Sequence, residues 1–314
     1  MEVRSNDFRK AIFEKGVSFE NVRFFKNRFN DAKLISSTFD HASFSDDDLE
    51  NVNFQDSSFS ETSFNRVNLQ GGSFKQTRLV ETNFSNLQLG GTYWHGANLF
   101  NVTFEHVDFV SEFGQPYGLS KITGPLGRAF GLNIVNSDMS EVLLPNLVLT
   151  NSKFSNVKLE NSDLSNSIFS QVELTNVGLD AANLQYSHWE NVKASMVRFN
   201  QANISNGHFS ECQIEGSDLR KVEGLESAQF YSNTGLASFK ATNLSDLDFS
   251  GHNLMKINFS HAVLDYTNFE DANLYNCNFD YAMFDNTNFD KAKVCGSTFI
   301  MANTWDALGL DLCP

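Results

Sequence analysis

Large hydrophobic residues recur at every fifth position along most of this chain. A first series runs from Phe19 to Phe109 and contains 19 such positions, all of them Phe, Leu or Trp. A second series, from Ile134 to Leu219, contains 18, and a third, from Phe239 to Phe299, contains 13. These 50 positions hold 24 of the 31 phenylalanines in the chain. The pattern therefore indicates an internal repeat of five residues.

A second, mostly smaller residue stands two positions before each large one, and the positions between are mainly polar. A period of five fits neither a helix, at about 3.6, nor a strand, at about 2. It predicts a chain that makes a quarter turn every five residues, so that twenty residues form one square coil. Coils stacked at strand spacing would give about 12 coils and a rod of roughly 60 Å. Its filled axis weighs against an internal ligand site.

Three stretches match a known repeat pattern residue for residue: Ala97-Asn98-Leu99, Ala182-Asn183-Leu184 and Ala272-Asn273-Leu274. They resemble the pentapeptide-repeat family, whose pattern is Ala-(Asn/Asp)-(Leu/Phe)-X-X, with Phe replacing Leu more often here. The resemblance covers about 250 residues. It implies an all-β fold, a right-handed quadrilateral β-helix. It is specific for the fold and not for a function.

Both ends of such a solenoid have to be blocked, because an open coil edge can pair with another chain. Residues 1–16 are expected to form a short helical cap that ends at Gly16. Residues 303–314 are expected to cap the other end, with Trp305 and Leu308 lying over the last coil. The alternative use of this apolar tail is a homodimer contact.

Two interruptions divide the repeat into the segments 17–109, 134–219 and 237–302. Residues 110–133 contain two of the four prolines and five glycines, a composition that cannot continue a tightly wound coil. Residues 220–236 form the second interruption, and both keep the phase of five. We expect two loops extruded from a continuous rod, because linkers between three shorter rods would have no reason to hold this phase. Loops on a rigid scaffold often carry function.

The formal net charge of −15 argues against nucleic acid or anionic lipid as a direct ligand, because both are bound through clustered Lys and Arg. A protein partner fits this charge better. The four cysteines show no close pair and no metal-finger spacing, which indicates a reduced, cytoplasmic protein. The chain has no apolar run of signal-peptide or membrane-span length, so we expect no membrane association.

No set of residues has the spacing of a catalytic or cofactor site. The seven histidines are scattered without a metal-ligand spacing, and no phosphate loop, Rossmann fingerprint or nucleophile elbow occurs. Only His252 falls on an inward position, where a local hydrogen bond is its expected role. We therefore expect no catalytic residue, no cofactor and no metal, and a protein that is not an enzyme.

Acidic residues are concentrated near the end of the third repeat segment. Six acids and no Lys or Arg occur between positions 265 and 290. Because residues twenty apart lie one coil apart on the same face, Asp265 is expected to stack on Asp285, and Glu270 on Asp290. Such columns of like charge carry a small cost in stability. They suit solubility, and they also suit a slender acidic rod that imitates duplex DNA.

The second interpretation, imitation of duplex DNA, is based on a resemblance to the Qnr and mycobacterial MfpA proteins. These are pentapeptide rods that resemble DNA and engage type II topoisomerases. The resemblance implies a bacterial protein that modulates or protects DNA gyrase or topoisomerase IV. The alternative is an interaction scaffold or bacterial effector whose partner is unrelated to DNA. The residues expected to contact a partner lie in the acidic segment and in the two interruptions: Asp265, Glu270, Asp280, Asp285, Asp290, Pro116, Tyr117, Arg128, Phe230 and Tyr231.

Overall fold

The computed structural model describes residues 1–13, 16–94, 96–108, 129–232, 234–235 and 237–312. The chain divides into two compact units, unit 1 (Met1–Asp163) and unit 2 (Leu164–Pro314). Each unit is an all-β solenoid whose short strands pair in parallel. In the described residues the only helix is the single 3-10 turn η2 (Leu225–Ser227).

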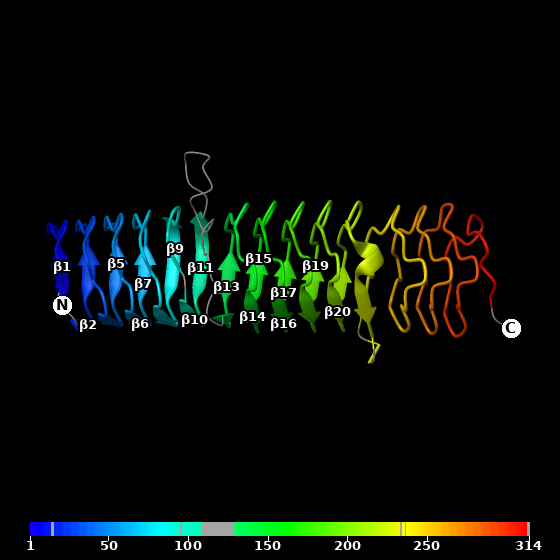
Figure 1. Ribbon diagram of the computed structural model, residues 1–314, viewed down its shortest axis with the longest axis horizontal. Coiled ribbons are helices and arrows are strands. Elements are labelled where there is room, and N and C mark those ends of the chain that lie inside the picture. The colour runs from blue at the N-terminus through cyan, green and yellow to red at the C-terminus, as the bar shows by residue number, and fades with distance from the viewer. Residues whose placement is uncertain (14–15, 95, 109–128, 233, 236, 313–314) are drawn as a thin grey trace. The chain divides into compact units, whose positions relative to one another are not determined.

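Unit 1 winds the chain through two columns of parallel strands, which lie side by side in Figure 1. The first column is β1 (Glu2–Arg4), β3 (Arg23–Phe25), β5 (Ser43–Ser45), β7 (Ser63–Asn65), β9 (Asn83–Gln88), β11 (Thr103–Asp108), β13 (Asn133–Val135) and β15 (Lys153–Ser155). The second column is β2 (Ser18–Glu20), β4 (Thr38–Asp40), β6 (Ser58–Ser60), β8 (Arg78–Val80), β10 (Asn98–Phe100), β12 (Ala129–Phe130) and β14 (Val148–Thr150).

The pairing register shows a coil of twenty residues with four faces. In the two strand columns, residues twenty apart are partners, as in Phe44↔Phe64. Two further faces are joined by isolated bridges with the same offset, for example Arg28↔Asp48 on one and Lys33↔Asn53 on the other. The square coil predicted from the sequence is thereby confirmed. The right-handed sense of the winding stays a prediction from the family resemblance.

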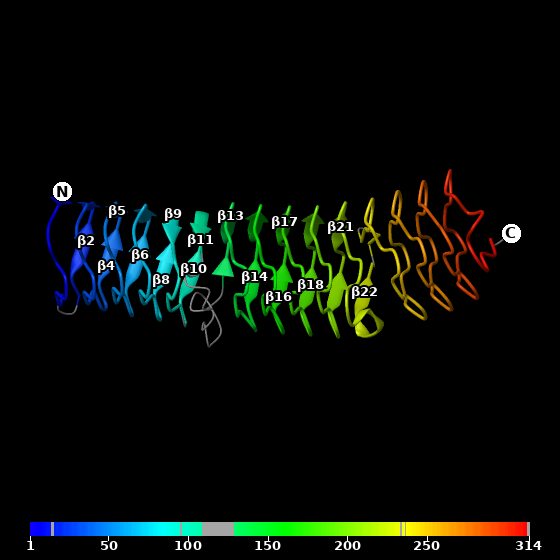
Figure 2. The same cartoon turned by 90° about the horizontal axis from the view of Figure 1, so that it is seen from above.

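Unit 2 repeats this winding, and its strands are best followed in Figure 2. One column is β16 (Ile168–Ser170), β18 (His188–Glu190), β20 (His208–Ser210) and β22 (Gln229–Tyr231). The other is β17 (Glu173–Thr175), β19 (Lys193–Ser195) and β21 (Gln213–Glu215). Beyond β22 the coils continue to pair in parallel through isolated bridges, of which Asn288↔Leu308 involves the residues nearest the C-terminus.

Phenylalanine rings fill the axis of both units. Phe44 is fully buried and stacks on Phe24 of the preceding coil and Phe64 of the following one, with ring centroids 4.6 and 4.9 Å apart. In unit 2, Phe259 and Phe279 lie 4.9 Å apart with an interplanar angle of 3°. Such pairs contribute about 0.5–1.5 kcal/mol beyond the burial of their area. The predicted inward positions are therefore confirmed.

Each corner of a coil is a tight turn with one residue in the left-handed region. After Phe29, the N–H of Ala32 donates to the Phe29 carbonyl over 2.8 Å, and Asp31 between them has φ 60°. This is the geometry of a type II turn, which requires a positive φ at its third residue. Asn often fills the position, as at Asn51 and Asn276, because a short polar side chain tolerates this conformation.

The helical cap predicted for residues 1–16 is wrong for the residues that the structure describes. β1 pairs in parallel with β3, as in any later coil. Asp7 forms a bridge with Arg28, and the ring of Phe8 stacks on that of Phe29 at 4.8 Å. The first residues of the chain therefore form a coil of the solenoid rather than a lid over it.

The cap predicted for residues 303–314 also differs from the structure. Trp305 is 93% exposed and Leu308 is exposed as well, so neither side chain lies over the last coil. Leu308 instead forms a bridge with Asn288 and extends the winding. Residues 313 and 314 lie outside the described part. The apolar residues of this end consequently face solvent.

Pairing on either side of the first interruption gives the length of the insertion. β10 pairs with β12 through Leu99↔Ala129, an offset of thirty in place of twenty. Ten additional residues are thus accommodated in this coil, and the phase of five is kept. The winding resumes at β12, inside the predicted loop 110–133, whose residues 110–128 lie outside the described part.

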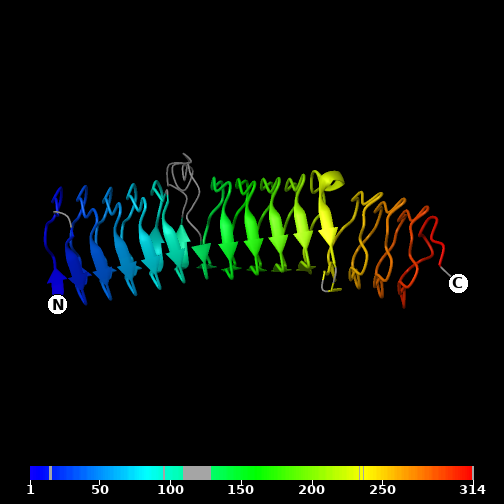
Figure 3. The same cartoon turned by 60° about the horizontal axis from the view of Figure 1, so that its bottom comes forward.

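The second interruption is much shorter than predicted. The sequence pattern predicts a loop over 220–236, yet β22 lies within it and pairs with β20. The offset there is twenty-one, because η2 accommodates one additional residue just before β22 (Figure 3). The offset then grows to twenty-five at Gln213↔Ser238. The prediction of a loop is therefore wrong for the residues of η2 and β22.

Three cysteines are placed by the structure. Cys212 and Cys277 are buried at the predicted inward positions, and burial raises the pKa of each thiol to about 12. Cys295 is disulfide-bonded. The prediction of a fully reduced protein is therefore wrong for Cys295.

We expect Cys212 and Cys277 to resist alkylation in the folded protein, because a buried protonated thiol is a poor nucleophile. Mass spectrometry after iodoacetamide treatment should find both unmodified under native conditions and both modified in urea. Native labelling of either residue at the rate of an exposed cysteine would contradict the position that the structure gives it.

Candidate protein-interaction site

One column of negative charge runs along a face of unit 2. The N–H of Asp285 donates to Oδ1 of Asp265 over 3.1 Å, so these residues lie one coil apart on the same face, as predicted. Partial burial raises the pKa of Asp265, and the charges of Asp285 and Asp246 raise it further. We call Asp246, Asp265 and Asp285 the first acidic column.

The second acidic column, Glu270 and Asp290, includes a basic neighbour that the sequence analysis did not consider. Nζ of Lys291 lies 3.3 Å from Oε1 of Glu270 and 3.6 Å from Oδ2 of Asp290. These are exposed pairs, and such pairs contribute little to stability. They do reduce the net charge that a partner would meet here. The carboxylate of Asp280 makes a different contact: its Oδ1 accepts the N–H of Ile300, which lies one coil further on, over 2.8 Å.

The residues predicted to contact a partner from the two interruptions are placed unequally. Pro116, Tyr117 and Arg128 lie outside the described residues. Phe230 is only 5% exposed and stacks on Phe209, so its ring belongs to the core. Tyr231 is exposed and remains accessible.

Tyr231 ends an exposed row of flat side chains that the sequence analysis missed. The rings of His188 and His208 stack with centroids 4.7 Å apart, and Tyr231 follows parallel to His208 at 6.5 Å. The Tyr231 hydroxyl donates to Oε1 of Gln229. The signal was present in the sequence, since His188 and His208 are twenty residues apart.

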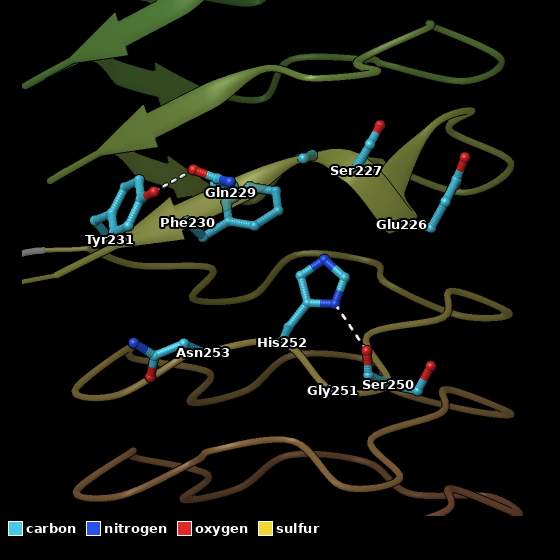
Figure 4. Close-up of a pocket in the computed structure, with 10 residues that line it drawn as sticks. Glu226, Ser227, Gln229, Phe230, Tyr231, Ser250, Gly251, His252 and Asn253 are labelled. Carbon is cyan, nitrogen blue, oxygen red and sulfur yellow. Dashed lines mark hydrogen bonds between the residues drawn. The ribbon is translucent and has the colours of Figure 1, made fainter.

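A pocket of about 440 Å³ opens in unit 2 beside the second interruption, between η2 with β22 and the coil that follows (Figure 4). Leu225 takes the inward position that the strict repeat would give to Gly224, because the chain holds one additional residue at η2. The pocket is lined by Glu226, Ser227, Ala228, Gln229, Phe230, Tyr231, Ser250, Gly251, His252 and Asn253.

His252 is held by backbone carbonyls at the wall of this pocket. Its Nε2 lies 3.0 Å from the carbonyl oxygen of Leu225, and its Nδ1 lies 3.2 Å from that of Ser250. Its ring also packs edge-on against Phe249. The predicted role of His252 as a local hydrogen-bonding residue is confirmed. Both ring nitrogens thus lie at hydrogen-bond distance from a backbone carbonyl, one of them in the preceding coil.

In the described part of the chain, no group of three or more His, Cys, Asp or Glu residues is placed to bind a metal ion. No helix in it is long and apolar enough to cross a bilayer. The candidate surfaces are the two acidic columns, the aromatic row and the pocket beside His252.

Sequence models of two kinds match the repeats. A model described as a pentapeptide repeat region matches residues 37–111 and 144–219, and a model of eight pentapeptide repeats matches 253–290. Together they cover more than half of the chain. The chain belongs to the pentapeptide-repeat family. The stretches quoted above from the sequence are therefore true members of this repeat.

Several solved structures are similar to this pentapeptide-repeat protein. HetL from Nostoc sp. strain PCC 7120, a pentapeptide-repeat protein involved in regulating heterocyst differentiation, is 19% identical, and the match covers 75% of this chain and 91% of HetL with a TM-score of 0.28. QnrB1, a plasmid-mediated fluoroquinolone resistance protein, is 14% identical, with 80% and 93% covered and a TM-score of 0.29. No curated protein sequence matches the chain.

Proposed function

We propose that this pentapeptide-repeat protein is a non-enzymatic, cytoplasmic protein that binds a protein partner through its acidic columns. The more specific part of the proposal is that the partner is a bacterial type II topoisomerase, DNA gyrase or topoisomerase IV, which the columns engage in place of DNA. The resemblance to Qnr and MfpA supports this choice of partner. The filled axis supports a role at the surface and not within the solenoid.

The observation that carries the proposal is the contact between Asp265 and Asp285. Their carboxylates repeat along the stack at the spacing of coils, about 4.8 Å, on a face where a third acid, Asp246, adds to the field. A line of closely spaced negative charges is the feature of DNA that proteins recognise without reading its sequence. A basic groove that accepts a DNA backbone would be attracted to such a column.

The test measures supercoiling by purified gyrase, and decatenation by topoisomerase IV, at micromolar concentrations of this protein. We expect inhibition, or rescue from a quinolone, that weakens as salt is raised. The quadruple variant Asp265→Asn, Glu270→Gln, Asp285→Asn and Asp290→Asn should require a concentration about tenfold higher or more, because complementary charge is lost.

The matched control removes four negative charges from unit 1, through Glu50→Gln, Asp56→Asn, Glu61→Gln and Glu81→Gln. It changes the net charge by the same amount and should leave the effect on the enzyme unchanged. Equal losses in both variants would show that only total charge matters. No effect of the unaltered protein on either enzyme would refute the topoisomerase part of the proposal.

A scaffold or effector with a partner unrelated to DNA is favoured by a different observation. Exposed apolar side chains stand among the acids of unit 2, notably Tyr266, Tyr281 and Met283. Apolar side chains contribute nothing to a surface that imitates DNA through its negative charge, whereas apolar and aromatic residues anchor many protein interfaces. A pulled-down partner that binds no DNA, and whose capture is lost on Met283→Asp but not in the quadruple acidic variant, would establish this alternative.

A further inference from the structure

His188 and His208 form a pair of imidazoles on the outer surface of unit 2. They occupy equivalent places in β18 and β20, where they are register partners. Their rings stack with centroids 4.7 Å apart and planes inclined by 24°. His188 is exposed and His208 is half-buried, so solvent reaches both residues. The repeat itself brings the two rings together, because residues twenty apart lie one coil apart on the same face.

The ring nitrogens of this pair are free to bind a ligand. Within the residues that the structure describes, neither imidazole forms a hydrogen bond or an ion pair. Two other histidines differ: the ring nitrogens of His41 lie 2.9 and 3.1 Å from carboxylate oxygens, and those of His252 lie against two backbone carbonyls. A neutral imidazole keeps one nitrogen with an available lone pair. The pair therefore offers two such nitrogens side by side.

The spacing of the two rings suits one shared metal ion. A zinc–nitrogen bond is about 2.0–2.1 Å long, so two nitrogens bound to one tetrahedral ion lie about 3.4 Å apart. Small rotations about the side-chain bonds can bring the nitrogens of the two rings to this distance. The backbone does not have to move. The N–H of His188 donates to the Ser167 carbonyl over 2.8 Å, and that of His208 to the Ser187 carbonyl over 2.9 Å. Ligands held on paired strands are positioned before the ion arrives.

The charge around the pair favours a cation. The outward positions of β16, β18, β20 and β22 are Ile168, Ser170, His188, Glu190, His208, Ser210, Gln229 and Tyr231. They include one carboxylate and no Lys or Arg. The carboxylate is that of Glu190, which stands two residues after His188 on the same side of β18. An approaching cation therefore meets an attractive field on this face.

We propose that His188 and His208 together bind one divalent transition-metal ion, Zn²⁺, Ni²⁺ or Cu²⁺. Imidazole suits these ions, whereas Mg²⁺ and Ca²⁺ prefer oxygen ligands. Cu²⁺ binds most tightly of the three, following the general order of affinities. Two protein ligands leave positions open to water, unlike a structural zinc site, in which the protein fills all four. The site uses neither acidic column and does not depend on the partner proposed above.

The experiment titrates the full chain with Zn²⁺ by isothermal calorimetry at about pH 7.5, where histidine side chains are largely neutral. We expect His188→Ala and His208→Ala each to weaken the tightest zinc site about tenfold or more, because one imidazole alone cannot chelate. The double variant should bind no more weakly than either single variant, since both act on one shared ion. Urea midpoints of the variants check that the fold is kept.

Two further variants make the test specific to this pair. His261→Ala removes another exposed imidazole, stacked on Tyr281 at 4.9 Å, and should leave zinc binding unchanged. Ile168→His adds a third imidazole to the row, because Ile168 is the register partner of His188, and should tighten binding about tenfold. Absence of zinc binding up to millimolar concentrations overturns the proposal. So does a double variant that binds as the unaltered protein does, or single losses that simply add, which would indicate two separate ions.

Discussion

Replacing Phe44 by alanine is expected to destabilise unit 1 by about 3–5 kcal/mol, the range for removing a large buried aromatic side chain. The ring is fully buried between Phe24 and Phe64, and it stacks on both nearly in parallel. Its removal leaves a cavity and takes away both stacking contacts, together with the tilted and edge-on contacts to Phe29, Phe39 and Phe54. The stacked coils on either side hold the backbone in place and limit collapse into the space. Urea denaturation followed by circular dichroism measures the loss.

Two control variants separate packing from mere loss of atoms. Phe44→Leu keeps most of the volume, and Leu fills equivalent positions at Leu34 and Leu49, so we expect a loss of about 1.5 kcal/mol or less. Tyr266→Ala removes a large ring that is exposed and should change stability by about 0.5 kcal/mol at most. If Phe44→Ala were no more costly than Tyr266→Ala, the aromatic ladder would not be the core of this fold.

The five-residue spacing predicts the coil, its four faces and its inward residues, because one geometry repeats with little dependence on distant contacts. It fails where the chain gains a single residue. Val3, Phe8 and Phe13 already follow the period of five, but Phe19 comes six residues after Phe13. Counting back from Phe19 in steps of five therefore misses Val3, Phe8 and Phe13, and the first coil is not recognised as part of the repeat. The helix signals in the same residues then suggest a cap. The pairing Glu2↔Arg23, with an offset of twenty-one, accommodates the additional residue.

The second interruption misleads in the same way. Leu225 and Phe230 are five apart and both are buried, but Leu225 follows Leu219 by six residues. A search in one fixed phase misses them and assigns a loop. A search that allowed single-residue shifts would have recovered both the first coil and β22. The assignment of Phe230 to a loop was wrong for this reason.

The first acidic column was predictable, because a spacing of twenty directly gives the position one coil away. Lys291 was missed in the second column, since it stands one residue beyond the acidic run and reaches back to Glu270. Spacing places backbones, but it does not say where a long flexible side chain goes. The pocket beside His252 was not predictable either, because it lies at η2, where the strict repeat places no additional residue.

Asp47 is expected to make the stability of unit 1 depend on pH. The carboxylate is 2% exposed at an inward position that elsewhere holds small residues. Burial raises its pKa from 3.8 to about 6, although N–H groups of Asn27 and Ser45 donate to it and oppose this shift. Well below pH 3.8 the carboxyl is protonated in both folded and unfolded chains, and its contribution is constant.

As the pH rises from about 4 to about 6, the unfolded chain releases its proton more readily than the folded one, so the free energy of unfolding falls. The full shift corresponds to about 3 kcal/mol, all of it lost above pH 6. Asp47→Ser removes the charge and keeps an acceptor, as Ser57 does when its Oγ accepts the N–H of Ser37 over 3.0 Å. Both proteins contain the same remaining carboxyl groups. The difference between their free energies of unfolding therefore isolates the pH dependence that comes from Asp47.

That difference should grow in favour of Asp47→Ser between about pH 4 and about pH 6 and then level off. Asp47→Ala is the contrasting variant, because it leaves the buried N–H of Asn27 without its acceptor and should cost about 1–3 kcal/mol at every pH. A difference that does not vary with pH would mean that the N–H donors offset burial and leave the pKa of Asp47 the same in the folded and unfolded chains. The polar pair Asn27 and Asp47 would then not weaken the two coils that it joins at neutral pH.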